Sequence, residues 1–513
     1  MRKASSKLAL CAALLTFASL VPFLFAGTET ITEMRMRRTV TPRYTLDQAV
    51  LTALQRNADI QKARQEIERT KGLYIQTRAE ILPRIDANWN VQNTDPHLGS
   101  ISTSSGGGGL SGVPTSYSMS IQATQVVFAG GRIVSGIRSA AFTRDSSYFG
   151  FRNAVDLVVA TVKQQFYQVL LNRELINVQE SSVNLLKSQL QDQQNRFEAG
   201  TVPRFNVLQA QVALSNQYPL LIAAQNNYRI SVLQLAKTLG LDFDPMRAGQ
   251  PPLEAIGQLE FHPRHIPLPM AIELAKDRRP FLKQQKALVL SNAAQVNVAR
   301  SGYFPHFSVT AGEDFRSSPI SEDISAVRSG YVFGGTGSWA IWDWGATYGS
   351  VKQARAILEE SKITLDDANR QVELEVQQQD SNLRQSAELV KATEESVGQA
   401  QEALRLASAR LSAGAGTQLE VLNSRVEVTQ AESNRIQALY NYNVALAEFD
   451  RVTATEVVYS NELDEPHTRD KTRTDAKPTP APKPSPLELN HAGNREPVTT
   501  RTTTTTRTTV SPK

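Results

Sequence analysis

The stretch Arg196-Phe197-Glu198-Ala199-Gly200 recurs in the second half of the chain as Arg410-Leu411-Ser412-Ala413-Gly414, an offset of 214 residues. Eight residues after each glycine stands a leucine, Leu208 and Leu422. A fixed offset between two distant segments indicates an internal duplication, and a duplication sets the architecture of the whole chain. The 513 residues are therefore predicted to form two copies of one unit rather than several unrelated domains.

The duplication extends well beyond these stretches. Phe128 matches Trp342 at the same offset, whereas Ala49 matches Ala271 at an offset of 222. The offsets differ by eight residues, which we assign to a loop around the glycine run Gly106–Gly109, because surface loops tolerate changes in length. The two copies are accordingly placed at 44–265 and 266–458.

Both copies contain a long span without proline in which apolar residues recur at every seventh position. Examples are Val155, Val162 and Val169 in the first copy, and Val376, Leu383 and Val390 in the second. A strict seven-residue period predicts long helices packed side by side along a shallow supercoil. Flanking positions are rich in Gln, Asn, Ser and Ala, so each helix should have a narrow apolar stripe and a large solvent-exposed surface. Long helical hairpins are expected at 132–240 and 346–455, with Pro219 interrupting and bending the second helix of the first copy.

Segments of alternating polarity precede each hairpin. In the first of them Ile85, Trp89 and Val91 alternate with Asp86 and Asn90. A period of two over about ten residues is typical of membrane β-barrel strands, although a soluble hairpin with one buried face gives the same pattern. Strands are predicted at about 84–93, 117–127, 306–315 and 331–342. The side chains expected to face lipid are Ile85, Trp89, Val91, Ile121, Phe307, Val309, Phe333 and Trp339.

The number of strands bears on the oligomeric state. A membrane sheet must close, because an open edge leaves backbone groups without hydrogen bonds in lipid. Four strands are too few, since small barrels need about eight. We therefore expect a mainly helical fold with a membrane β part, in which three copies form a twelve-stranded outer-membrane barrel and a ring of long helical hairpins.

The ends of the chain differ in composition from the repeats. A basic start followed by an apolar run predicts a secretory signal peptide at 1–26, with a membrane anchor as the alternative. A linker at 27–43 follows. The segment 459–513 is rich in Pro and Thr, has too little apolar surface for a core, and is expected to be disordered.

Enzymatic, metal-binding and nucleic-acid-binding functions find little support in the sequence. The formal net charge of +5 is small for this length and shows no concentrated basic patch, so nucleic acid is not an expected partner. His262 and His265 have a spacing used in metal sites, but they stand among prolines with no cysteine nearby. We expect no cofactor, no metal and no catalytic residues.

At this point the residues resemble a known family, the TolC-type outer-membrane factors of multidrug efflux and type I secretion. The resemblance covers about residues 44 to 454 and is carried by Tyr44-Thr45-Leu46-Asp47-Gln48-Ala49, Leu82-Pro83, Phe128-Ala129-Gly130-Gly131-Arg132, and Arg196 to Pro203 followed by Val207-Leu208-Gln209-Ala210. It implies a homotrimer in the outer membrane with a helical tunnel through the periplasm. It also implies a periplasmic adaptor (membrane fusion protein) and an inner-membrane transporter as partners.

The resemblance further implies roles for particular residues. The turns that would form the periplasmic tip and dock the adaptor contain Arg196, Gly200, Thr201, Val202, Arg410, Gly414, Gly416 and Thr417. The positions where family members carry gating carboxylates are Asn206, Glu420 and Asn423. Only Glu420 is acidic here, and Gly416 replaces a cationic partner, so a charge-bridged closed gate is not expected. An ordinary solvated helix carboxylate is the alternative for Glu420.

The sequence is thus interpreted as an outer-membrane exit duct of a tripartite efflux or type I secretion system. The alternative is a structural periplasmic coiled-coil protein without transport activity, which would explain the seven-residue period but not the duplicated strands. The cargo cannot be chosen from the sequence.

Overall fold

The computed structural model describes residues 42–93, 115–242, 251–264, 266–317 and 328–455. All its helices and strands belong to one unit, which spans 43–513. The predicted signal peptide, nearly all of the predicted linker, the glycine run Gly106–Gly109, His265 and the predicted tail at 459–513 lie outside the described residues.

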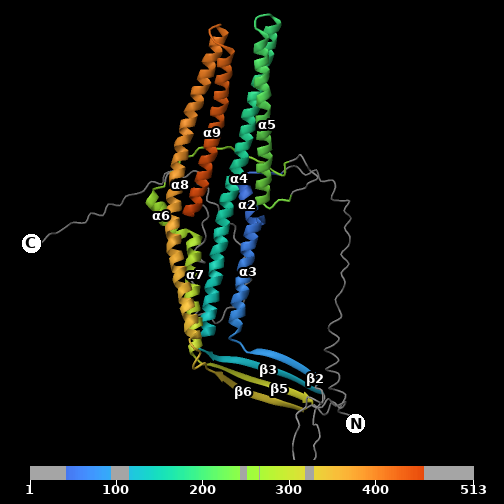
Figure 1. Cartoon of the computed structure of the whole chain (residues 1–513), viewed down its shortest axis with the longest axis vertical. Helices are drawn as coiled ribbons and strands as arrows, with labels where there is room; N and C mark the ends of the chain where they lie inside the picture. Colours follow the sequence, from blue (N-terminus) through green and yellow to red (C-terminus); the bar gives the residue numbers. More distant parts are fainter. Residues whose placement is uncertain (1–41, 94–114, 243–250, 265, 318–327, 456–513) are drawn as a thin grey trace, which may run out of the picture. The chain divides into compact units, whose positions relative to one another are not determined.

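The order of elements is duplicated, as the fixed offset predicts. The first copy contains β1 (Arg43–Tyr44), α2 (Leu46–Arg56), α3 (Ala58–Ala79), β2 (Arg84–Asn93), β3 (Thr115–Ala129), α4 (Arg132–Glu198), α5 (Arg204–Thr238) and β4 (Glu254–Ala255). The second contains α6 (Leu268–Arg278), α7 (Pro280–Arg300), the 3-10 turn η4 (Ser301–Tyr303), β5 (His306–Ser317), β6 (Arg328–Ser338), α8 (Ala346–Ser412) and α9 (Gln418–Thr453). Each copy is thus two short helices, two strands and a long helical hairpin (Figure 1).

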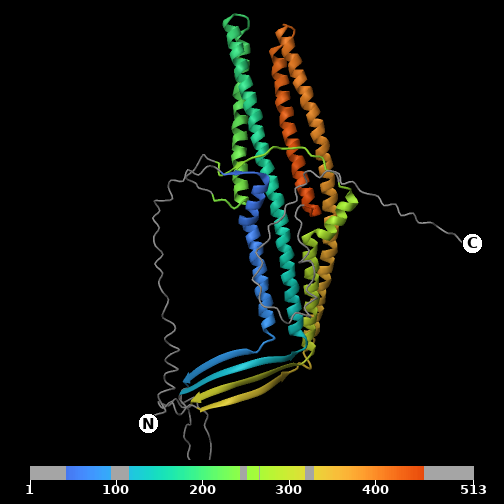
Figure 2. The same ribbon diagram turned by 180° about the vertical axis from the view of Figure 1, so that it is seen from behind.

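The helices form two rows that share α4 and α8. These two helices have 67 residues each, which corresponds to a length of roughly 100 Å. In the half next to the sheet, neighbours pack in the order α3, α4, α7 and α8. In the other half the order is α5, α4, α9 and α8. These long helices, together with α3 and α7, therefore form a wall of helices packed side by side, and the short helices α2 and α6 pack against it (Figures 1 and 2).

The apolar side chains gather into one core cluster per copy, where the short helices meet the hairpins. In the first copy Phe166 and Leu235 are buried with Leu253 from the segment after α5. In the second, Tyr442 and Phe449 are buried with Leu282 of α7. The heptad positions quoted above are buried within these clusters, as the seven-residue period predicts.

Two features of the hairpins do not follow from the seven-residue apolar period. Helix α5 is continuous through Pro219, and the bend expected there stays a prediction. A proline removes one backbone hydrogen bond, and the neighbouring turns evidently hold the helix together. In addition, α8 begins after Trp344, whose φ of 54° is left-handed, whereas the first copy has Gly130 with φ 57° at the equivalent position.

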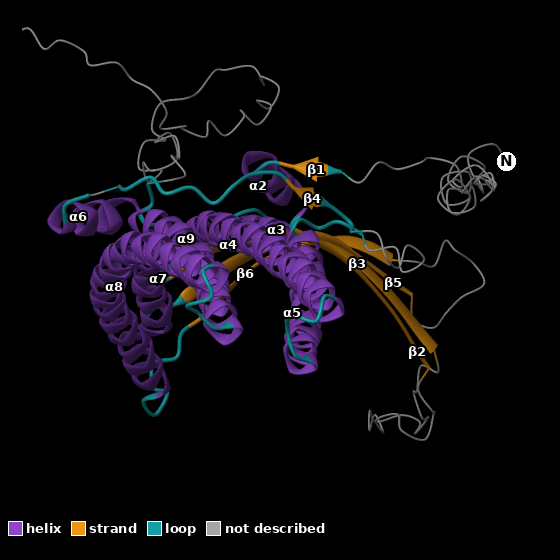
Figure 3. Cartoon of the chain, turned by 90° about the horizontal axis from the view of Figure 1, so that it is seen from above, coloured by secondary structure: helices purple, strands orange, loops and turns teal. Residues whose placement is uncertain are grey.

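The four long strands form one antiparallel sheet in the order β2-β3-β5-β6. The sheet lies at the end of the helical wall opposite the two hairpin turns and is curved, as the view from above shows (Figure 3). The short strands β1 and β4 form a separate parallel pair. Among the described residues, β2 and β6 form the two edges of the four-stranded sheet and are each paired on one side only.

Candidate functional site

The two hairpin turns have the same backbone structure. Gly200 and Gly414 have φ values of 74° and 75°, which only glycine adopts without strain. The Thr201 N–H donates to the Arg196 carbonyl at 2.9 Å, and the Ala415 N–H donates to the Arg410 carbonyl at 2.9 Å. Together with the bonds from the glycine N–H groups to the residues three positions earlier, these bonds define a Schellman motif at each helix end. We call these two segments, 196–204 and 410–418, the tip turns.

The helices that leave the tip turns begin differently. Thr417 caps α9, its hydroxyl accepting a hydrogen bond from the Glu420 N–H at 3.3 Å. The equivalent Pro203 begins α5 without a side-chain cap. Val202 and Gly416 are half-buried within the turns, and Thr201 is exposed. A side chain at position 416 would lie 3.0 Å from the Leu411 nitrogen, so this glycine is needed for close packing.

The three gate candidates all lie close to the tip turns. Asn206 and Glu420 are half-buried in the first turns of α5 and α9, and Asn423 is exposed. Glu420 has a cationic neighbour that the sequence pattern does not indicate: Arg410 Nη1 lies 3.8 Å from its Oε2. Both side chains are largely exposed, so this ion pair adds little stability. Arg196, which is equivalent to Arg410, instead pairs with Asp192 of its own helix at 3.0 Å.

The sheet register places the predicted lipid-facing residues on one face. Trp89 is opposite Met119, Ile121 opposite Ala87, and Phe333 opposite Ala311. Directly paired residues in an antiparallel sheet point to the same side. Ile85, Val91, Phe307 and Val309 belong to this same face. Apart from Val309, which is half-buried, all of the predicted lipid-facing residues are exposed.

Strand β6 runs from Arg328 to Ser338, shifted toward the N-terminus from the predicted 331–342. Trp339 therefore lies just beyond the strand rather than within it. Its indole N–H donates to the Tyr303 carbonyl at 3.2 Å, where the strand returns to the helices. The glycines of β6 weakened the alternation from which the strand was predicted.

The opposite face of the sheet is polar. Its rows contain Asn88, Ser120 and Asp314, then Asp86, Gln122 and Gly312. Arg316 pairs with Asp314 at 2.9 Å, and Gln122 Nε2 donates to Asp314 at 3.2 Å. The other face is mostly apolar, with Glu313 opposite Ile121 and Gln125 opposite Val309 as its polar members. The sheet thus separates a mostly apolar surface from a hydrogen-bonded polar one, as in a barrel between lipid and water.

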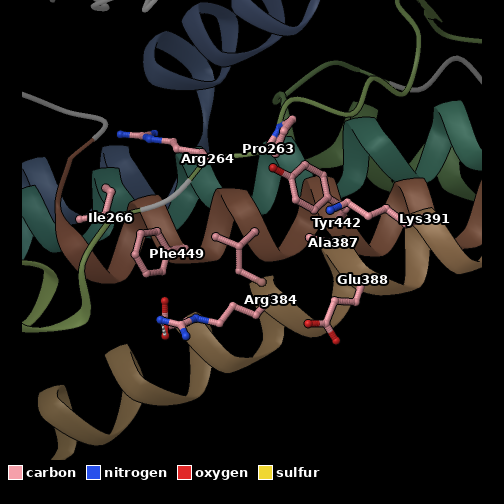
Figure 4. A pocket seen from close by; sticks show the side chains of 11 residues that line it. Pro263, Arg264, Ile266, Arg384, Ala387, Glu388, Lys391, Tyr442 and Phe449 are labelled. Atoms are coloured by element: carbon pink, nitrogen blue, oxygen red, sulfur yellow. Dashed lines mark ion pairs between the residues drawn. The ribbon is translucent and has the colours of Figure 1, made fainter.

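A cavity of about 220 Å³ lies beside the second hairpin, away from the tip turns and the sheet. Ile266, Ala387 and Phe449 form its apolar part, and Arg384, Glu388 and Lys391 stand at its rim (Figure 4). Arg264 at the rim binds Asp450 at 2.8 Å. Burial raises the pKa of the Tyr442 phenol, whose hydroxyl donates to the His262 carbonyl. These contacts fasten the segment between the two copies to the second hairpin, and they place no nucleophile beside a base.

Metal-binding groups do not gather either. In the described ranges, no three His, Cys, Asp or Glu side chains come close enough to hold a metal ion. His262 instead contacts the Glu260 carboxylate at 2.7 Å.

Among the described residues, no helix combines the length and the apolar character that a membrane span requires.

Comparisons with known proteins agree with this geometry. The chain is 25% identical over 309 residues to the toluene efflux pump outer membrane protein TtgC of Pseudomonas putida, covering 57% of each chain. It is 23% identical over 338 residues to the outer membrane protein TolC of Escherichia coli, covering 63% of this chain and 66% of TolC. The chain thus spans somewhat less than two thirds of the length of these relatives.

Among solved structures, the CmeC outer membrane channel of Campylobacter jejuni has the same fold. The TM-score is 0.69 at 17% identity, over 80% of this chain and 85% of CmeC. The family model described as outer membrane efflux protein matches residues 50–241 and 271–455, which are the two copies seen in the sequence. The chain therefore belongs to the outer membrane efflux protein family.

Proposed function

We propose that three copies of this chain form an exit duct of an efflux or type I secretion system in the outer membrane. The sheet would cross the membrane, and the helical wall would extend into the periplasm. The observation that carries this proposal is the sheet itself: one face is mostly apolar, the other is polar, and among the described residues β2 and β6 are each paired on one side only. A sheet in lipid cannot keep open edges.

Closure by copies of the same chain is consistent with strand direction. Four antiparallel strands run alternately, so β6 of one copy is antiparallel to β2 of the next. Three copies give twelve strands, a number within the range of single-chain outer-membrane barrels.

The helical wall has edges that suit the same arrangement. Helix α5 stands at one edge of the tip half and exposes Phe205, Val212 and Ile222 by 69, 58 and 63%. Helix α8 stands at the other edge of the tip half and exposes Leu406 by 50%. Apolar surface on both edges favours contact with neighbouring copies.

The tip turns are the proposed docking site for a periplasmic adaptor, which would connect the duct to an inner-membrane transporter. They lie at the far end of the wall from the sheet and present Thr201 and Gly414 to solvent (Figure 1). In a trimer, the three copies of Glu420 and the three copies of Asn423 would lie near the duct axis.

Transport tests the proposal. A strain without this chain should lose export of its pump's substrates and regain it with the wild-type chain. The purified protein should form a conducting pore in a planar lipid bilayer. Loss of export together with conductance supports the duct. Normal export in the deletion strain and an insulating bilayer would leave a structural periplasmic coiled-coil protein as the better reading.

A further inference from the structure

In the first copy, the guanidinium of Arg173 joins helix α4 to the segment after α5. It donates from Nη1 to the Ala255 carbonyl at 3.0 Å and from Nη2 to the Gly257 carbonyl at 2.6 Å. It also pairs with Glu174, the next residue of α4, at 3.2 Å. Burial raises the pKa of the Tyr228 phenol on α5, and the charge of Arg173 opposes this shift, so the two groups interact. The first copy thus holds a cation beside a carboxylate and a tyrosine.

The second copy has a cavity at the equivalent place. At the offset of 214, Arg173 is replaced by Ala387, which lines the cavity of about 220 Å³ described above. Tyr442 and Glu388, the equivalents of that tyrosine and that glutamate, line the same cavity. Its outer wall is the segment before α6 rather than a segment after the hairpin. The exchange of arginine for alanine therefore keeps the tyrosine and the carboxylate and opens space between them.

Two of the three cations at the rim of this cavity are already paired. Arg264 binds Asp450 at 2.8 Å, and Arg384 binds Asp380 at 2.9 Å. The side chains of these two aspartates are only 13% and 11% exposed. Both ion pairs therefore belong to the wall of the cavity, and their carboxylates are not available to a ligand.

Glu388 and Lys391 are the other charged groups at the rim. Both are exposed and lie one turn apart on α8, and neither forms an ion pair with any residue that the structure describes. In the first copy the equivalent of Lys391 is Asn177, which donates to Glu174 at 3.1 Å. Glu388 thus lacks both side-chain contacts of its equivalent, the arginine and the asparagine amide. Its carboxylate is free to meet a cation from solution.

The floor of the cavity is apolar and aromatic. Leu383 and Phe449 are buried in the core of the second copy, and the Tyr442 ring lies beside them (Figure 4). Apolar walls with a few polar groups are typical of small-molecule sites, and aromatic faces attract cations. We propose that this cavity binds a small organic cation, whose guanidinium or ammonium head pairs with Glu388 and whose short apolar stem packs on Tyr442 and Phe449.

The bound cation takes the place that the Arg173 side chain has in the first copy. It contacts α8, α9 and the segment before α6 together, so binding stabilises the junction of these three elements. The groups of the site all belong to one chain. The site therefore goes beyond the proposed duct function and does not depend on it.

The probe for this site is n-butylguanidinium, and its neutral counterpart is n-butylurea, which has nearly the same shape. Saturation-transfer NMR of the detergent-extracted protein, against a blank with detergent alone, should give a dissociation constant on the order of millimolar for the cation. The urea should bind at least about tenfold more weakly, because it cannot pair with a carboxylate.

Substitutions in the cavity test each contact. Glu388→Gln should weaken binding by at least about tenfold, whereas Glu402→Gln, on an exposed part of the same helix, should bind like wild type. Lys391→Asn, which installs the residue of the first copy, should tighten binding because it removes a repelling charge. Ala387→Arg should abolish binding, because it fills the cavity with the side chain of the first copy.

The duplication supplies a matched gain of function. Arg173→Ala should open the same kind of space beside Glu174 and roughly double the amount of cation bound at saturation. If Arg173→Ala does not fold, Arg173→Ala combined with measurements on Ala387→Arg is unnecessary, since the loss of binding in Ala387→Arg and Glu388→Gln already decides the proposal. Circular dichroism and oligomer mass report whether each variant is folded.

Several results would overturn the proposal. They are equal binding of n-butylguanidinium and n-butylurea, unchanged binding in Ala387→Arg or Glu388→Gln, and tighter binding of n-butyrate than of the cation, which would assign an anion site to Lys391. Each of these leaves the duct standing, because conductance in bilayers tests the duct separately. An insulating wild-type protein that binds the cation would contradict the duct and leave this site intact.

Discussion

Gly200 and Gly414 stand 214 residues apart and have φ values of 74° and 75°, each ending a helix of 67 residues. The duplication has thus kept helix length and turn conformation while side chains diverged around them. Differences between the copies mark positions where the two halves have different roles. Two such differences lie near the tip, where Pro203 is equivalent to Thr417 and Gln193 to Ala407.

The two tip glycines should be required for their backbone conformation alone. A Cβ at either position meets no atom within 4 Å, so Gly200→Ala and Gly414→Ala should each cost about 1 kcal/mol from the left-handed conformation. Faster amide exchange confined to the tip turns would report this. Gly398→Ala is the control with opposite sign, because Gly398 lies inside α8 with open space around it and alanine favours the helix. Slower amide exchange at the tip turns of Gly200→Ala or Gly414→Ala would contradict the left-handed conformation assigned to these two glycines.

Gly240 should be far less tolerant than the tip glycines. It has φ 68°, and a Cβ there would lie 2.6 Å from the Arg56 carbonyl oxygen. Backbone strain and a clash with backbone combine, so Gly240→Ala should destabilise by more than about 2 kcal/mol. Thermal unfolding of the detergent-extracted protein measures the loss of stability in Gly240→Ala and compares it with the loss in Gly200→Ala. Equal melting temperatures for the two variants would refute this ranking.

Neighbouring residues of β2 should respond oppositely to a charge. Trp89 belongs to the apolar face and Asn88 to the polar face of the same strand. Trp89→Arg should destabilise the membrane-inserted form by about 2–4 kcal/mol if the site is near the bilayer centre, whereas Asn88→Arg should be nearly neutral. The amount of oligomer recovered from outer membranes is the readout. Normal recovery of both variants would show that the apolar face does not meet lipid.

Asp343 should make the start of α8 sensitive to acid. Its carboxylate accepts hydrogen bonds from Thr347 N–H at 2.7 Å and Gly345 N–H at 3.0 Å, and the bonds to Thr347 are the main cause of its lowered pKa. Because the folded pKa is depressed, the stabilisation is present above the unfolded value of about 3.9 and is lost as the pH falls through the folded pKa. Fluorescence of the neighbouring Trp342 and Trp344 should follow this loss. Asp343→Asn should abolish the transition, and Asp366→Asn, from farther along α8, should retain it.

The seven-residue and two-residue periods predicted most of the fold, because repetitive packing leaves repetitive sequence. The polar-apolar alternation around Trp89 identified a strand, and the register then placed Trp89 and Ile121 on one face. The end of β6 was harder to predict from the sequence, because its glycines have no side chains and interrupt the polar-apolar alternation. Helix α5 continues through Pro219 because a single lost hydrogen bond does not end a helix whose other contacts persist.

The contacts at the tip were less accessible to sequence reasoning. Arg410 and Glu420 are neighbours because a turn reverses the chain between them, and only the turn geometry gives their 3.8 Å separation. Gln189 and Gln193 look like ordinary surface glutamines in a polar stretch. Their burial depends on α9, which follows more than two hundred residues later. A comparison of the two copies, glutamine against alanine, was the available signal.

The central claim is that copies of this chain close one sheet into a membrane duct. It is tested most directly by the native mass of the protein after detergent extraction from isolated outer membranes, combined with cross-linking between cysteines placed on β2 and β6. We predict the mass of three chains, with cross-links that join different chains. A monomer, or a protein released from the membrane fraction without detergent, would contradict the closed barrel.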